Sequence, residues 1–118
     1  MKTRLVVAIA ILSAQLISGQ KINAKEIADY QTNLMVERLD LNQEQKKKIT
    51  EHNLKFSKKQ AALMNREGSM FGKIGDIKKI KKERNAELEI ILNKEQMEVF
   101  EDEIEPEIRK HMRKKMME

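Results

Sequence analysis

The chain has 118 residues, with 24 Lys and Arg against 19 Asp and Glu, a formal net charge of +5 and no cysteine. A chain of this length has room for one small domain and is too short for a Rossmann or barrel enzyme. The lack of cysteine excludes disulfide scaffolds, zinc ribbons, thiol catalysis and a lipid-modified Cys after a leader. The net positive charge is compatible with binding to nucleic acid, which other features of the sequence must support or exclude.

The first 20 residues have the pattern of an export signal. Lys2 and Arg4 supply two positive charges, and residues 5–12 are an unbroken apolar run. This pattern is typical of a signal peptide, whereas a membrane anchor needs about 20 apolar residues. We expect residues 1–20 to be removed, which leaves 21–118 as a periplasmic domain without a transmembrane anchor. The alternative is an anchor that is not cleaved.

Helix-forming residues dominate the mature chain. Apolar residues at spacings of three and four predict four helices, at residues 24–38, 43–67, 76–91 and 94–116. Gly68, Gly72 and Gly75 predict a turn over residues 68–75, and Pro106 predicts a kink in the last helix. We therefore expect an all-α fold.

The pattern Leu-Asn-x-Glu-Gln occurs twice, at residues 41–45 and 92–96, each time between two predicted helices. An Asn at a helix start accepts a backbone hydrogen bond, and a Gln three positions later reaches back to the Asn, so the pattern predicts a capping box. We interpret the repeat as a structural motif without a catalytic role. Its residues are Leu41, Asn42 and Gln45 in the first copy and Leu92, Asn93 and Gln96 in the second.

The doubled motif resembles that of the LTxxQ-motif family of periplasmic proteins, the Spy/CpxP-like proteins. Both copies have Asn where the family usually has Thr, and Asn is an equally good helix cap. The resemblance covers about residues 24–105. It implies a cradle-shaped homodimer of bent helical hairpins. It also implies an ATP-independent chaperone of the envelope-stress response, an adaptor that restrains an envelope-stress sensor kinase, or a metal-responsive protein.

Charge is segregated along the mature chain, whose net charge is +3. Residues 43–84 carry +8, residues 85–107 carry −8 and residues 108–118 carry +4. If the two helices around the glycine turn fold back on each other, their cations share one hairpin, which favours an acidic partner. The alternative is a solvated face, with an acidic start and a basic end of the last helix that suit its dipole.

Methionines and a Phe lie among cations around the predicted turn. Flexible Met side chains adapt to varied apolar partners, and cations attract acidic ones. We expect this surface to bind unfolded or partly folded envelope proteins without ATP, with capture slowed by salt. The expected contact residues are Lys58, Lys59, Met64, Arg66, Met70, Phe71, Lys73 and Ile74. The alternative is that the apolar members close the core of the hairpin.

Metal sensing is a second hypothesis. His111, Met112 and Met116 offer imidazole and thioether ligands for copper, or part of a zinc site shared across a dimer. The sequence lacks a His-x-x-x-His pair, and a Met-rich amphipathic tail also suits packing. We therefore expect no cofactor.

Other functions have less support in the sequence. We expect the glutamates of the last helix to face solvent and to lack the burial that tunes a carboxyl group for catalysis, so we do not expect an enzyme. The basic run at residues 78–82 has no interleaved aromatics, and an exported chain does not meet DNA, which argues against nucleic acid. A basic amphipathic helix can instead lie on anionic lipid.

Overall fold

The computed structural model describes residues 22–117, so the predicted signal peptide at residues 1–20 lies outside the described part. Its helices are α2 (Ala24–Arg38), α3 (Gln43–Asn65), α4 (Met70–Ile91), α5 (Lys94–Val99), η1 (Phe100–Ile104) and α6 (Glu105–Met117). No strand occurs within residues 22–117, which confirms the predicted all-α fold. No helix in this range is both long enough and apolar enough to cross a bilayer.

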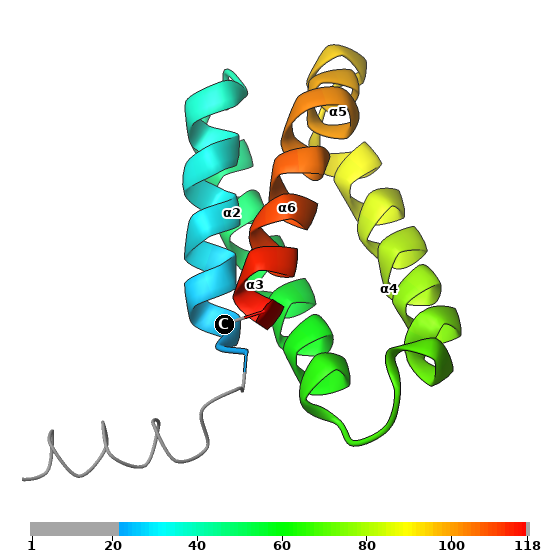
Figure 1. Cartoon of the computed structure of the whole chain (residues 1–118). Coiled ribbons are helices and arrows are strands. Elements are labelled where there is room, and N and C mark those ends of the chain that lie inside the picture. Colours follow the sequence, from blue (N-terminus) through cyan, green and yellow to red (C-terminus); the bar gives the residue numbers. More distant parts are fainter. Residues whose placement is uncertain (1–21, 118) are drawn as a thin grey trace, which may run out of the picture.

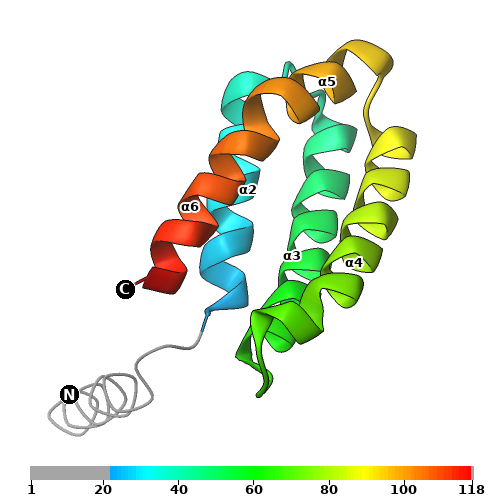
Figure 2. The same cartoon turned by 45° about the vertical axis from the view of Figure 1, so that its right-hand side comes forward.

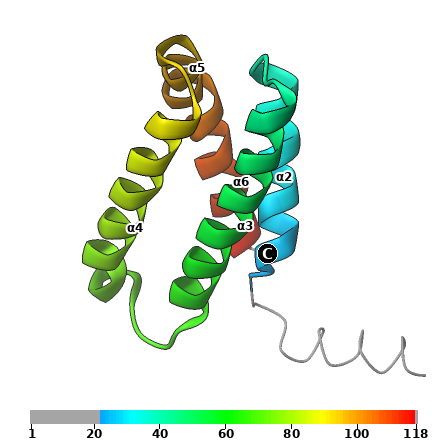
Figure 3. The same cartoon turned by 180° about the vertical axis from the view of Figure 1, so that it is seen from behind.

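The helices form two successive hairpins closed by a C-terminal arm. Helix α3 packs against α2 on one side and α4 on the other (Figure 1). The arm begins with α5 above the α3–α4 pair, and α6 then runs back beside α2. Figure 3 shows from behind that the tip of the α3–α4 hairpin lies at the opposite end of the molecule from α5.

Asn side chains begin three of the helices. Asn23 accepts a hydrogen bond from the backbone N–H of Glu26 at 3.1 Å. Asn42 and Asn93 each form a complete capping box with the Gln three residues later, as the repeat predicts. The capping boxes fix where α3 and α5 begin, and both helices begin at the predicted residues.

Helix α4 begins at Met70 rather than at the predicted residue 76. The Ser69 hydroxyl caps it by accepting a hydrogen bond from the N–H of Gly72 at 3.2 Å. The turn is therefore shorter than the predicted 68–75, and Gly68 alone among the described residues has a positive φ, of 115°. Gly in a helix costs about 1 kcal/mol relative to Ala but does not forbid the helix, so Gly72 and Gly75 lie inside α4.

The last predicted helix runs through α5, η1 and α6 and contains a π-helical segment. The N–H of Glu105 bonds to the carbonyl of Phe100, five residues back. Pro106 has no N–H to continue the usual α-helical pattern, and the π-helical turn rearranges the hydrogen bonds just before it. Figure 2 shows that α5 and α6 run in different directions, so the helix bends in η1.

The apolar core lies at the end of the molecule where the two capping boxes are. It consists of Leu34, Met35, Leu39, Leu41, Ile49, Leu88, Leu92, Met97, Phe100, Ile104 and Ile108. From α4 it includes Leu88 alone, near the end of that helix. The first turns of α4 therefore extend beyond the core, and their apolar side chains are left for other contacts.

Candidate functional site

The first turns of α4 carry an exposed apolar group, which we name the tip surface. It consists of Met70, Phe71 and Ile74, whose exposed fractions are 45%, 85% and 42%. None of the three belongs to the core cluster. Burial of these side chains would remove a large apolar area from water, so the tip surface favours association with another apolar chain.

Three of the predicted contact cations lie exposed near this end of the hairpin. Lys59 pairs with Glu83 at 3.3 Å, and Arg66 pairs with Asp76 at 3.2 Å. Lys58 is exposed and has no ion pair within residues 22–117. Exposed pairs contribute little to stability, so these cations can exchange their partners for an acidic ligand.

Lys73 is buried, with an exposed fraction of 4%, and does not belong to the exposed cations. Its ammonium donates to the carbonyl of Met64 at 3.3 Å and, in a shorter contact, to the carbonyl of Arg66. These carbonyls lie at the end of α3, where the helix leaves acceptors without intrahelical donors. Lys73 therefore closes the α3–α4 hairpin. The prediction that Lys73 is one of the exposed cations that contact an acidic client is wrong.

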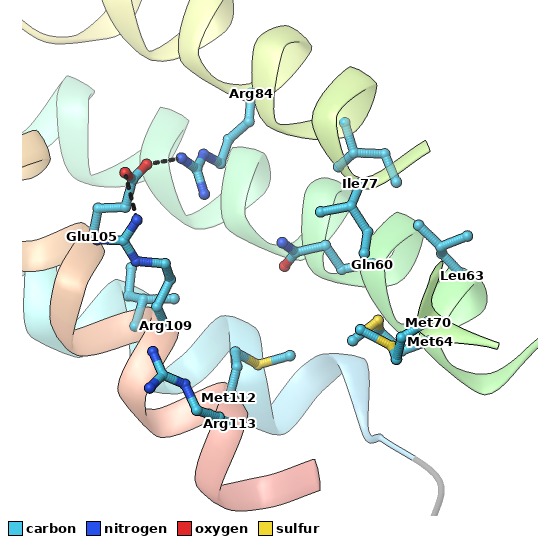
Figure 4. A pocket seen from close by; sticks show the side chains of 12 residues that line it. Gln60, Leu63, Met64, Met70, Ile77, Arg84, Glu105, Arg109, Met112 and Arg113 are labelled. Atoms are coloured by element: carbon cyan, nitrogen blue, oxygen red, sulfur yellow. Dashed lines mark hydrogen bonds and ion pairs between the residues drawn. The ribbon is translucent and has the colours of Figure 1, made fainter. Parts of the chain in front are cut away.

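A groove of about 320 Å³ opens between the α3–α4 hairpin and α6 (Figure 4). Met64, half-buried, and Met70 line it, so the groove continues from the tip surface into the molecule. The other apolar lining residues are Leu63, Ile77, Ile80, Ile108 and Met112, and the polar ones are Gln60, Arg84, Glu105, Arg109 and Arg113. The sequence analysis did not predict this groove, because one of its walls comes from α6, which is separated in the chain from the α3–α4 hairpin.

Glu105 is a buried carboxylate at the inner end of this groove, which corrects the expectation that the glutamates of the last helix all face solvent. It makes a close ion pair with Arg84, and the ammonium of Lys81 lies 3.4 Å away. Arg109 lies 4.0 Å from the same carboxylate. Burial lowers the pKa of Arg84, while the charge and hydrogen bond of Glu105 oppose that change. Because three cations face one carboxylate, positive charge is in excess at this end of the groove.

A second polar cluster joins α3 to α4. The exposed fraction of His52 is 2%, and its Nδ1 lies 3.2 Å from Oε1 of Glu87. Burial lowers the pKa of His52, and the Glu87 carboxylate partly opposes this effect. Glu87 also pairs with Lys55, and the hydrogen bond from Lys55 lowers the pKa of Glu87. A change in the protonation of His52 therefore acts on the α3–α4 interface.

The side chains proposed as metal ligands have separate neighbours. The ring of His111 stacks on that of Tyr30, with ring centroids 3.8 Å apart and an interplanar angle of 11°. Met112 lines the groove, and the side chain of Met116 lies outside the described part. Residues 22–117 contain no cluster of three His, Asp or Glu side chains placed to hold a metal ion.

Comparison with known proteins identifies a family. The model of DUF4890, described as a domain of unknown function, matches residues 14–100. No curated protein and no solved structure matches the chain significantly. Since the family model matches more than half of the chain, the protein belongs to the DUF4890 family.

Proposed function

We propose that the protein is an ATP-independent periplasmic chaperone that binds unfolded or partly folded envelope proteins. The main support is the exposure of Phe71, 85%, beside Met70 and Ile74. When an unfolded chain covers a large exposed apolar side chain, that side chain is removed from water, which stabilises the complex. Methionine adapts its shape to different sequences, which suits a binder of varied clients.

Positive charge along α4 supports the same proposal. Lys78, Lys79 and Lys82 are exposed on the helix that carries the tip surface. Long-range attraction raises the rate at which acidic, unfolded segments arrive, and weak apolar contact lets them leave without nucleotide. Capture should therefore slow as salt concentration rises, because salt screens exposed charges.

The leader pattern and the doubled Leu-Asn-x-Glu-Gln motif also favour this function. We propose on these grounds that the protein is LTxxQ-like and that two copies form a cradle. Static light scattering on the mature protein measures the assembly directly. A mass of two chains is expected, and a mass of one chain would contradict the dimer.

The chaperone proposal is tested by aggregation of a denatured client protein. The mature protein, at equimolar concentration and low salt, is expected to slow the rise of light scattering after dilution of the client. At high salt the same concentration should protect less. Unchanged client aggregation at low salt would contradict the proposal.

A further inference from the structure

The groove combines apolar walls with arginine side chains on its α6 side (Figure 4). Leu63, Met64, Met70 and Ile77 lie on the side of the α3–α4 hairpin. Arg109 and Arg113 lie on α6, which also lines the groove with Ile108 and Met112. A ligand in the groove therefore meets apolar side chains on both walls and the guanidinium groups of Arg109 and Arg113 on the α6 side.

The size of the groove restricts the occupant. Its volume of about 320 Å³ lies near the lower end of the range for small-molecule sites, roughly 300 to 1,000 Å³. The walls are mainly apolar, with a few polar groups, which is the usual chemistry of such sites. A single hydrocarbon chain suits this space, because flexible Met side chains adapt to a flexible ligand.

The charges select the head group of that ligand. Glu105 is already neutralised by its close ion pair with Arg84, and Lys81 lies 3.4 Å away. Arg109 reaches Glu105 only at 4.0 Å, and Arg113 has no ion pair within residues 22–117. Guanidinium groups bind carboxylates through two parallel hydrogen bonds, so these two arginines can receive an added carboxylate.

We propose that the groove binds a long-chain fatty acid. Its hydrocarbon chain lies between Met64, Met70 and Met112, and its carboxylate lies at Arg109 and Arg113. The acidic head complements the excess positive charge at this end of the groove. The proposal does not depend on the chaperone function, because the exposed Phe71 is not part of the groove lining.

Displacement of cis-parinaric acid, a fluorescent fatty acid, tests the proposal on the mature protein. The chain has no Trp, so intrinsic fluorescence does not overlap with the probe signal. Oleate, kept below its micelle concentration, should displace the probe at least about tenfold more effectively than oleyl alcohol, which has the same chain but no charge. The proposal is overturned if the probe does not bind or if oleyl alcohol competes as well as oleate.

Matched variants of α6 locate the head group. R109Q/R113Q is expected to weaken oleate binding about tenfold, while K110Q/K114Q removes the same charge from residues outside the groove lining and should change it little. Equal losses of oleate affinity in both variants would overturn the proposal, since they would show that oleate is attracted to the positive charge of α6 in general. Circular dichroism checks that the variants fold. If R109Q/R113Q does not fold, the comparison of oleate with oleyl alcohol on the original protein decides whether the groove binds a carboxylate head group.

Two further measurements separate this site from other occupants and from the chaperone function. Release of the probe as protein concentration rises, at a constant ratio of probe to protein, would assign the groove to a second copy and overturn the proposal. The F71S variant should keep its oleate affinity even where it loses protection of clients. A chaperone test that fails would therefore leave the oleate result standing.

Discussion

Gln45 and Gln96 join the two copies of the repeated motif through reciprocal amide hydrogen bonds. Nε2 of Gln45 donates to Oε1 of Gln96 at 2.8 Å, and Nε2 of Gln96 donates to Oε1 of Gln45 at 3.3 Å. Each Nε2 also donates to the backbone carbonyl just before the other motif, that of Ile91 or Asp40, at 3.1 Å. Each Oε1 accepts from its own N-cap backbone N–H at 3.0 Å. The capping boxes therefore also bind the α2–α3 connection to the α4–α5 connection.

Replacing Gln96 by Ala should lower the free energy of unfolding by about 1 to 3 kcal/mol, because it leaves partly buried polar groups without their hydrogen bonds. Q45A should have a similar but smaller effect, since Gln45 is less buried. The double variant should lose less than the sum of the single variants, because both remove the same amide pair. Urea denaturation measures all three, and strict additivity would contradict the coupling.

The control for this prediction is Gln43, an exposed residue in the first turn of the same helix as Gln45. It makes no hydrogen bond with the second motif. Q43A should change stability by less than about 0.5 kcal/mol, as for most surface substitutions.

Replacing Arg84 by Met should destabilise the fold by up to about 3 kcal/mol, because it leaves the buried Glu105 carboxylate without its close partner. Lys81 and Arg109 retain part of the compensation, which keeps the loss at the lower end of the range for buried pairs. Adding E105L to R84M should restore much of the stability. K82M, at an exposed neighbour on α4, is the control in thermal denaturation, and an equal loss there would contradict the role of the pair.

Stability should fall as pH drops below about 6.5, because the pKa of His52 is lowered in the folded protein. In that range the unfolded chain binds a proton on His52 that the folded chain does not, so acid favours unfolding. The pKa of Glu87 is also lowered, and its contribution is lost at lower pH, below the usual value of 4.5. The urea midpoint measured between pH 8 and pH 5 covers the range in which the His52 contribution begins to be lost, and stays above the range of Glu87.

The H52Q variant should lose most of this pH dependence. H111Q removes the other histidine and serves as its control, because His111 lies outside the α3–α4 interface. If H111Q flattens the profile and H52Q does not, the assignment to His52 is wrong.

Replacing Lys73 by Met should lower stability by about 1 to 2 kcal/mol, because the carbonyls of Met64 and Arg66 lose a charged donor. K78M removes the same charge from an exposed position of α4 and should change stability little. Chemical denaturation compares the two variants. Equal stability of K73M and the original protein would contradict the capping role of Lys73.

Replacing Phe71 by Ser should weaken protection of an aggregating client while leaving stability within about 0.5 kcal/mol. Ile90 is the matched control, because it lies near the other end of α4 and has the same exposed fraction, 85%. I90S should protect the client as well as the original protein does. Equal loss of protection in F71S and I90S would show that the tip surface has no special role.

Short-range features of the fold follow from the sequence. Helix α2 spans the predicted residues, and α3 and α5 begin where Asn42 and Asn93 were predicted to cap them. Capping depends on residues three positions apart, so the sequence contains all the information that it requires. The start of α4 was misplaced, because Gly72 and Gly75 were interpreted as part of the turn.

Side-chain environments could not be predicted in the same way. Lys73 and Lys78 are the same residue type on one helix, yet only Lys73 is buried, because the first turn of α4 packs against the end of α3. The groove likewise needs α3, α4 and α6 to meet before its walls exist. Exposure of Phe71 depends on where the core ends, which the apolar pattern of α4 does not specify.

The sequence by itself determined the helical class, the capping boxes and the segregation of charge, since each depends on composition or on residues within one helical turn. The tertiary structure alone decided that Gln45 meets Gln96, that Lys73 caps α3 and that α6 lines a groove together with α3 and α4. The first and the last join segments distant in the chain, whereas Lys73 is only nine and seven residues from its acceptors and reaches them because α4 folds back on the end of α3. These contacts form only when the helices pack, because packing brings each side chain within a few ångströms of its partner.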